Sequence, residues 1–171
     1  MSDTSSFGRV IDALVAIPGQ AAYVSLFADT VICDGPWLQS DKPNSLVLIG
    51  YDDAAEAESA GAQLPMTFGP GGNGRIEEDY GVPCKITRWT GDSVAGAQKR
   101  VRDETLALFA VFELTIRTNG TLNGLIVPPP SGQPVSTWIE STSYRLTDPD
   151  EPAGRLFTVQ FTVHVQNSLN A

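Results

Sequence analysis

Residues 75–118 read RIEEDYGVPCKITRWTGDSVAGAQKRVRDETLALFAVFELTIRT and decide the fold of this chain. The part from 75 to 90 alternates between apolar and polar side chains, which is the period of a β-strand with one buried face. After Gly91 the pattern becomes helical for about 26 residues, with Asp92 as the predicted N-cap and Asn119-Gly120 as the left-handed stop. Such a helix would span about 39 Å. A long strand that leads directly into a long helix predicts an α+β fold.

The strand is predicted to lie at an edge of its sheet. Glu78 interrupts the apolar row, and Pro83 lacks the backbone N–H that an inner strand would donate. The apolar row consists of Ile76, Tyr80, Val82, Cys84 and Ile86, and the opposite row of Arg75, Glu77, Asp79, Lys85, Thr87 and Trp89.

The predicted helix changes character along its length. In the first half, Val94, Ala97 and Val101 are expected to face inward, and Lys99, Arg100, Arg102 and Asp103 outward. The second half, LALFAVFELTI, is apolar nearly all round, which predicts that it is covered on more than one side.

Shorter elements complete a single predicted domain over residues 1–171. They are a helix over 6–17, strands over 30–34, 45–51 and 122–127, and a closing C-terminal β-hairpin over 137–146 and 156–166. In the first hairpin strand, Trp138, Tyr144 and Leu146 are expected to share a face. Residues 52–74 are expected to form a long acidic and glycine-rich loop. The predicted fold is a mixed or antiparallel sheet on which an N-terminal helix and one long central helix pack.

Composition excludes several classes of protein. The chain has 171 residues, of which 42% are hydrophobic and 18% charged, as in ordinary globular domains. A net charge of −9 disfavours specific binding to nucleic acid, which needs clustered basic side chains. No apolar run approaches the roughly 20 residues needed to cross a bilayer, and we expect no secretion signal. Cys33 and Cys84 lack metal or disulfide spacing, so free thiols in a reducing cytoplasm are expected.

The sequence contains no recognisable catalytic, cofactor or metal motif. Gly69, Gly71 and Gly74 spell G-x-G-x-x-G, but a dinucleotide site needs a helix after these glycines, and here a strand is predicted. His164 is the only histidine and lies on the polar side of a strand, where a solvated or interface residue is favoured over a general base. The acids at 52–58 lack the spacing of a calcium loop. We therefore expect no enzyme activity, no cofactor and no metal; a small hydrolase or nuclease is the disfavoured alternative.

Charge is segregated along the chain. Residues 51–80 carry seven acids against one base, a net charge of −6, and residues 85–102 carry five bases against one acid, a net charge of +4. Opposite fields on one small domain favour docking to further copies or to partners. Trp37 and Trp89 are expected either at an interface or in a satellite core. The predicted subunit contact joins the acids Asp52, Asp53, Glu56, Glu58, Glu77, Glu78 and Asp79 to the bases Lys99, Arg100 and Arg102 of a neighbour.

The order of these pieces resembles a known family. VICDGP, VLIGYDD and PCKITRWTGD follow one another, and then come a long helix that ends near LNG and a closing strand, FTVHVQNSL. Over residues 7–169 this series resembles the tail terminator proteins of long-tailed bacteriophages, especially phages of actinobacteria. The insertion PPPSGQP and the length of the 52–74 loop depart from the family pattern.

The resemblance implies both a fold and a role. Members of the family are small α+β domains that assemble as a six-fold ring on the last ring of the tail tube. The ring stops tube growth and presents a surface to the head connector. The chain would then be a virion protein of the tail neck, assembled in the host cytoplasm, with further copies of itself, the tail tube protein and head–tail connector proteins as partners. DNA would pass through the ring without specific binding. The alternative is another neck or tail component, either a head-completion connector or a tail tube subunit.

Overall fold

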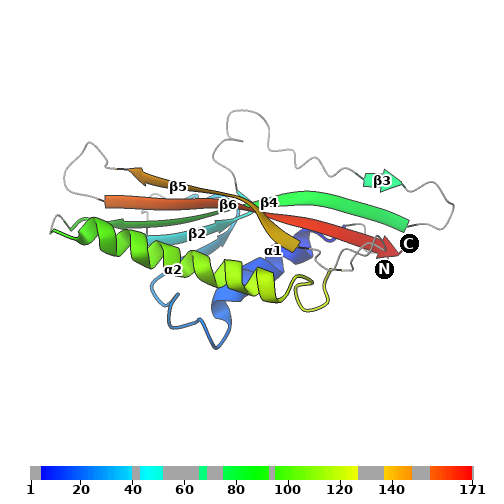
Figure 1. Ribbon diagram of the computed structural model, residues 1–171, viewed down its shortest axis with the longest axis horizontal. Helices are drawn as coiled ribbons and strands as arrows, with labels where there is room; N and C mark the ends of the chain where they lie inside the picture. The colour runs from blue at the N-terminus through cyan, green and yellow to red at the C-terminus, as the bar shows by residue number, and fades with distance from the viewer. Residues whose placement is uncertain are drawn as a thin grey trace.

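A computed structural model describes residues 5–39, 43–51, 66–68, 75–92, 95–126, 137–147 and 155–170. Within these residues the chain forms one six-stranded mixed sheet, two α-helices and a short 3-10 helix (Figure 1). In chain order the elements are α1 (Phe7–Ala16), η1 (Ile17–Gly19), β1 (Val31–Asp34), β2 (Ser45–Ile49), β3 (Met66–Phe68), β4 (Arg75–Thr90), α2 (Ala97–Thr118), β5 (Thr137–Thr147) and β6 (Arg155–Asn170). The predicted α+β class, with an N-terminal helix, a long central helix and a closing hairpin, is confirmed.

β4 lies at the centre of the sheet, so its predicted edge position is wrong. The strand order is β1-β2-β4-β6-β5, and β3 pairs with the first part of β4. β1 is parallel to β2, and the other neighbouring strands are antiparallel. β4 and β6 pair over all 16 residues of each strand. In Figure 1 these two strands run the length of the sheet and extend beyond the helices.

Pro83 is tolerated inside the sheet because of where β2 ends. Its carbonyl oxygen accepts hydrogen bonds from the N–H groups of Gly50 and Tyr51, at 2.8 and 3.2 Å. The N–H and C=O groups of one strand residue point toward the same neighbour, so the missing N–H of Pro83 also faces β2. Since β2 ends at Ile49, the missing donor falls at the end of that ladder, and the ladder to β6 is complete.

The core lies between the helices and one face of the sheet. Phe112 of α2 packs against Phe161 of β6 and against Phe27, with ring centroids 5.7 and 6.1 Å apart. The sheet thus covers one side of α2 and the segment around Phe27 covers the next. Ala107 and Leu114 remain exposed on the opposite side of α2. The prediction that the second half of this helix is covered on more than one side is therefore confirmed, but the helix is not buried all round. The apolar rows of the two central strands are buried as predicted: Tyr80, Val82, Cys84 and Ile86, and Phe157, Val159, Phe161, Val163 and Val165.

α2 begins later than predicted, and Asp92 is not its N-cap. The cap is Gly96, whose φ of +91° belongs to the left-handed region and cannot occur inside a right-handed helix. The first residue of α2 is therefore Ala97. Asp92 instead accepts a hydrogen bond from Arg100, at 3.1 Å.

The chain after α2 forms turns where a strand over 122–127 was predicted. The Asn119 side chain accepts a hydrogen bond from the backbone N–H of Asn123 (2.9 Å) and donates one to the Asn123 side chain (2.7 Å). The predicted end of the helix at Asn119-Gly120 is confirmed, because α2 ends at Thr118 and Asn119 is its C-cap. The predicted left-handed conformation of this stop is wrong, because the left-handed residues are Leu122, Asn123 and Gly124. Local hydrogen bonds from side chains compete with extended backbone structure in this segment. Turns continue up to Ile126, the last described residue of the segment.

A β-bulge in β5 changes which residues share a face. The register to β6 shifts between Ile139 and Ser141. Trp138 pairs with His164 and faces away from the helices, whereas Tyr144 and Leu146 pair with Val159 and Phe157 on the helix side. The prediction that these three residues share a face is therefore wrong, because one inserted residue inverts the alternation.

β3 lies inside the predicted 52–74 loop. Its three residues pair with Ile76, Glu77 and Glu78 of β4. A strand this short has no readable period, so the sequence alone did not indicate it. The remainder of the predicted loop lies outside the described residues.

Candidate interaction surfaces

A groove of about 510 Å³ lies on the sheet face opposite the helices. Its floor comes from three adjacent strands, and the segment between β1 and β2 forms one side. Lys85 is the only charged residue among the described residues that line it. The other lining residues are Trp37, Pro43, Leu46, Leu48, Tyr51, Thr87, Trp89, Leu156 and Thr158. We call this feature the Trp89 groove.

The register of the sheet assembles the Trp89 groove. Leu46 of β2 pairs with Thr87 of β4, which pairs with Thr158 of β6, and Trp89 pairs with Leu156. These residues alternate with core residues along their strands and so share the helix-free face. Trp89 is 44% exposed, which confirms its predicted outward position. An apolar groove with an open tryptophan is the kind of feature found at the centre of protein interfaces.

Sequence reasoning missed the groove as a unit. It identified Trp89 and Trp37 as exposed or satellite residues and the second strand as an apolar run. It did not bring Leu156 beside Trp89, because that requires the pairing of residues far apart in sequence. The available signal was that β2 is apolar at consecutive positions, which indicates that both of its faces are covered.

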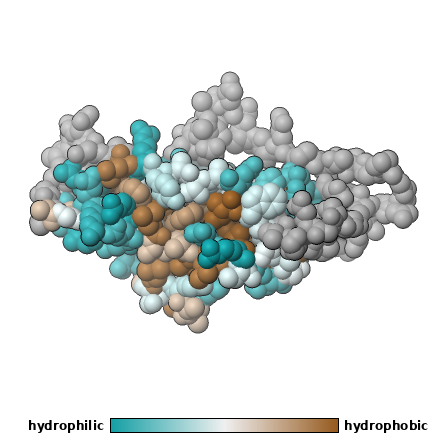
Figure 2. All heavy atoms as spheres, viewed as in Figure 1, coloured by the Kyte–Doolittle hydropathy of each residue, from teal (hydrophilic) through white to brown (hydrophobic). Residues whose placement is uncertain are grey.

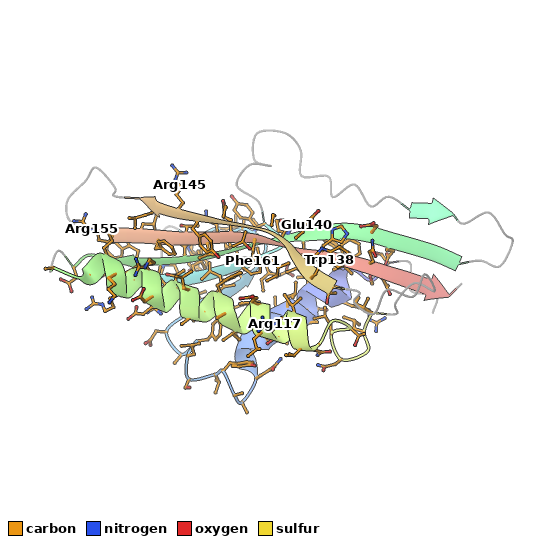
Figure 3. The ribbon with its side chains drawn as sticks, in the orientation of Figure 1. Arg117, Trp138, Glu140, Arg145, Arg155 and Phe161 are labelled. Atoms are coloured by element: carbon orange, nitrogen blue, oxygen red, sulfur yellow. The ribbon has the colours of Figure 1, made fainter. Side chains whose placement is uncertain are left out.

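His164 occupies a second cluster on the same face. Its Nε2 lies 2.6 Å from Oδ1 of Asp79, and its Nδ1 lies 3.2 Å from Oε2 of Glu140. Trp138 stacks on the imidazole with ring centroids 4.3 Å apart. The bulge in β5 lies at Glu140, and Figure 3 shows Glu140 next to Trp138 at the bend of the strand. His164 thus links the side chains of three strands.

This histidine cluster does not have the geometry of a catalytic triad. In the described part of the chain, the hydrogen-bonding partners of His164 are carboxylates, and no hydroxyl or thiol nucleophile bonds to it. Its side chain is 16% exposed, so the solvated position is met only in part, and the predicted alternative of an interface residue stays a prediction. Over the described residues, no three His, Cys, Asp or Glu side chains are grouped as ligands of a metal ion.

The basic residues of the predicted contact lie on the exposed side of the first turns of α2. Arg100 pairs with Asp92 at 3.1 Å, and Arg102 pairs with the adjacent Asp103 at 2.9 Å. Lys99 is exposed beside them. Figure 3 places Arg145 and Arg155 toward the same end of the molecule as the start of α2.

The predicted acidic residues divide into three groups. Asp79 is exposed and contacts His164 and Gln166, at 2.6 and 3.3 Å. Asp52, Asp53, Glu56, Glu58 and the side chain of Glu77 lie outside the described residues. Glu78 is 3% exposed and is hydrogen-bonded inside the chain, so its prediction as a contact residue is wrong. It lies on the core side of β4, where its alternation with Glu77 and Asp79 places it.

Glu78 instead anchors the start of α1. Its carboxylate accepts hydrogen bonds from the backbone N–H of Ser6, at 3.0 and 3.1 Å, and from the Ser6 hydroxyl, at 2.5 Å. Asn167 Nδ2 donates a further bond at 3.1 Å. The Tyr80 hydroxyl lies 2.8 Å from Ser6 Oγ, whose proton goes to Glu78, so Tyr80 is the donor there. Burial acts to raise the pKa of Glu78, but the hydrogen bonds from Ser6, Ser5 and Asn167 outweigh burial and hold the pKa below its usual value.

Both cysteines are free, as predicted. Burial raises the pKa of the Cys84 thiol to about 12 and also raises the pKa of Cys33. Because the thiolate is the reactive form, neither group is activated as a nucleophile.

No described helix combines the length and the apolar content that crossing a membrane requires. No family model matches the chain, and no curated protein matches it.

Proposed function

We propose that this chain is a tail terminator, a structural virion protein that forms a ring of six subunits on the end of a phage tail tube. The ring would stop tube elongation and join the tail to the head connector. The proposal is supported by the ordered series VICDGP, VLIGYDD and PCKITRWTGD, which resembles that family. It is also supported by an α+β fold of the kind that the resemblance implies.

The observation that carries the proposal is the helix-free face of the sheet. The helices bury one face, while the opposite face presents the Trp89 groove with a tryptophan that is 44% exposed. An open apolar groove on a soluble domain marks a surface that another molecule covers. A protein whose activity is assembly needs such surfaces and no reactive group.

Charge supports a head-to-tail arrangement of the copies. The exposed bases lie in the first turns of α2, which follows the C-terminal end of β4: Lys99, Arg100 and Arg102. The exposed acid Asp79 lies in the N-terminal half of β4. We propose that the bases of one subunit face Asp79 and the acidic 52–58 segment of the next. A heterologous contact of this kind closes into a ring when the rotation per subunit divides a full turn.

The mass of the purified protein in solution tests this proposal. We expect a closed oligomer at low salt, with assembly that weakens at high salt because the rim charges are screened. A strict monomer at every salt concentration, also in the presence of the tail tube protein, would contradict it. Negative-stain images separate the alternatives: rings support a terminator, whereas long tubes of the isolated protein indicate a tube subunit.

A further inference from the structure

Two Asn-Gly steps follow one another in the turns after α2. They are Asn119-Gly120 and Asn123-Gly124, and a third step, Asn73-Gly74, lies outside the described residues. Glycine has no Cβ to hinder the approach of its nitrogen to the preceding side chain, so asparagine loses its amide most readily before glycine. In Figure 1 the turns lie on the outside of the molecule at the end of α2, and Figure 2 shows the brown, hydrophobic atoms gathered nearer the middle.

Deamidation at such a step needs water and no enzyme. The backbone nitrogen of the glycine gives up its proton and attacks Cγ of the asparagine, and the bond from Cγ to Nδ2 breaks. Nδ2 takes up that proton and leaves as ammonia, so that a cyclic succinimide remains. Water then opens the ring at either carbonyl and gives aspartate or isoaspartate. The side chain must therefore be free to turn toward the glycine, and the glycine N–H must be free to lose its proton.

The side chain of Asn119 is held at both ends. Its Oδ1 accepts a hydrogen bond from the backbone N–H of Asn123, at 2.9 Å, and its Nδ2 donates one to Oδ1 of Asn123, at 2.7 Å. Its backbone is fixed as well, because its N–H donates to Thr115 and its carbonyl accepts from Leu122, both at 2.9 Å. Asn119 is also half-buried. Its Cγ can reach the nitrogen of Gly120 only after the side-chain bonds break.

The position of Asn119 also opposes a negative charge. Asn119 is the C-cap of α2 and lies beside the last carbonyl groups of the helix. Those groups carry partial negative charge, so the C-terminus of a helix disfavours an anion. The oxyanion formed during attack on Cγ and the final carboxylate would both meet this field. Deamidation is therefore disfavoured at Asn119 for a second reason.

Asn123 is held less firmly. It is exposed, and within the described part of the chain its side chain makes a single hydrogen bond, to Asn119. Its φ of +61° is left-handed, which is strained for a residue with a Cβ, so leaving this conformation releases strain. The N–H of Gly124 donates to Oγ1 of Thr121 at 3.2 Å, a long bond that restrains the attacking nitrogen only weakly.

We infer that Asn123 is a site of spontaneous deamidation in the folded chain, whereas Asn119 is protected by its hydrogen bonds to Asn123. This inference goes beyond the proposed function and does not depend on it, because a single chain carries the whole site. An aspartate at position 123 still offers an oxygen to Nδ2 of Asn119, so the protection outlasts conversion to aspartate. Each converted chain gains one negative charge in this turn.

The first test follows both asparagines while the wild-type chain is incubated in mildly alkaline buffer. Proteolysis after Leu122 separates the two steps, and mass spectrometry detects the conversion of amide to acid in each peptide. In the folded chain Asn123 should convert about 10-fold faster than Asn119, because only Asn119 must break two side-chain hydrogen bonds. In urea the two rates should be similar. Equal rates in the folded chain, faster conversion of Asn119, or an Asn123 that converts only in urea would each show that the inference is wrong.

Two variants at position 123 test the protection of Asn119. Asn123→Ala removes the acceptor of the Asn119 amide, so conversion at Asn119 should become about 5-fold faster. Asn123→Asp is the matched control, because it keeps an acceptor oxygen, and Asn119 should then convert as slowly as in the wild type. Circular dichroism confirms that both variants are folded. Faster conversion of Asn119 in both variants, or in neither, would contradict its protection by Asn123.

Thr121→Val tests the attacking nitrogen without changing either asparagine. It removes the acceptor of the Gly124 N–H, so Asn123 should convert about 3-fold faster. Thr118→Val is the control, because the Thr118 hydroxyl bonds to carbonyl oxygens within α2, and it should leave the rate at Asn123 unchanged. Conversion of Asn123 that is no faster in Thr121→Val than in the control would contradict the inferred restraint on this nitrogen.

Discussion

Glu78 is the residue on which the position of α1 depends most directly. It is a buried carboxylate between β4 and the N-terminus of the helix, and its acceptor capacity is used by Ser6 and Asn167. From sequence it looked like an interruption in an apolar row and a member of an acidic surface. Its real environment depends on Ser6, 72 residues earlier in the chain, which no local pattern identifies.

Glu78→Gln should destabilise the fold by about 1.5–3 kcal/mol at pH 7, because it removes hydrogen bonds to a charged acceptor. The folded pKa of Glu78 lies below its ordinary value of 4.5, so this stabilisation is fully present above pH 4.5 and is lost as pH falls through the folded pKa. Urea unfolding of both proteins as a function of pH measures the difference. Glu113→Gln on the exposed side of α2 is the control and should change stability little. An equal loss for the two variants, or a gap that does not shrink in acid, would contradict this role.

Gly81 tests how closely β4 and β6 approach. A Cβ placed at this position would lie 2.7 Å from Cγ2 of Thr162. Gly81→Ala should therefore cost about 1–3 kcal/mol through overpacking. Thr162→Ser removes that methyl group, so the double variant should regain most of the loss in thermal unfolding. A single Gly81→Ala variant as stable as the wild type would show that Thr162 can move aside freely.

At the scale of elements, the ends of α2 show what sequence patterns can and cannot locate. Periodicity predicted the existence of the helix and its inward side, confirmed by the burial of Ala97 and Val101. It placed the start too early because Asp92 is a good capping residue in isolation. The left-handed Gly96 decides the boundary, and that conformation is not visible in a hydrophobic pattern.

Two glycine substitutions test this boundary with opposite expected signs. Gly96→Ala should destabilise the fold by about 1–2 kcal/mol, because alanine is strained at φ +91°, although nothing lies within 4 Å to clash. Gly8→Ala, inside α1 and equally free of contacts, should stabilise by about 0.5–1 kcal/mol. Thermal unfolding of the two variants measures both. A stabilising effect at Gly96 would mean that α2 can begin earlier.

At the scale of the whole molecule, the fold class and most element positions could be predicted, but the surfaces could not. Strong alternation along 75–90 and 156–166 predicted the two long strands and their buried rows, although the last strand extends to Asn170. The central position of β4 could not be predicted, because Pro83 reads as an edge signal until the end of β2 is known. The Trp89 groove likewise depends on the pairing of three strands. Charge segregation predicted the exposed bases of α2 but also included Glu78, which is buried.

The exposed bases in the first turns of α2 should control how fast subunits associate. Lys99→Glu combined with Arg100→Glu should slow assembly at low salt about 10-fold, and the difference should shrink as salt is added. The control is Arg117→Glu, near the other end of α2, and each single variant, Lys99→Glu and Arg100→Glu, is compared with it, because each of the three changes the net charge by the same amount. The control should slow assembly less than either single variant. Stopped-flow light scattering measures the rates. Equal slowing by the three single variants would indicate a response to net charge alone.

Growth of tail tubes in the presence of this protein tests the central claim most directly. Tail tube protein polymerises with or without small amounts of the purified chain, and electron microscopy measures the tube lengths. If the chain acts as a closed ring that terminates the tube, tubes should stop growing and carry a ring at one end, and the Trp89→Ala variant should fail to stop them. Unchanged tube lengths and bare tube ends at saturating protein would contradict the account.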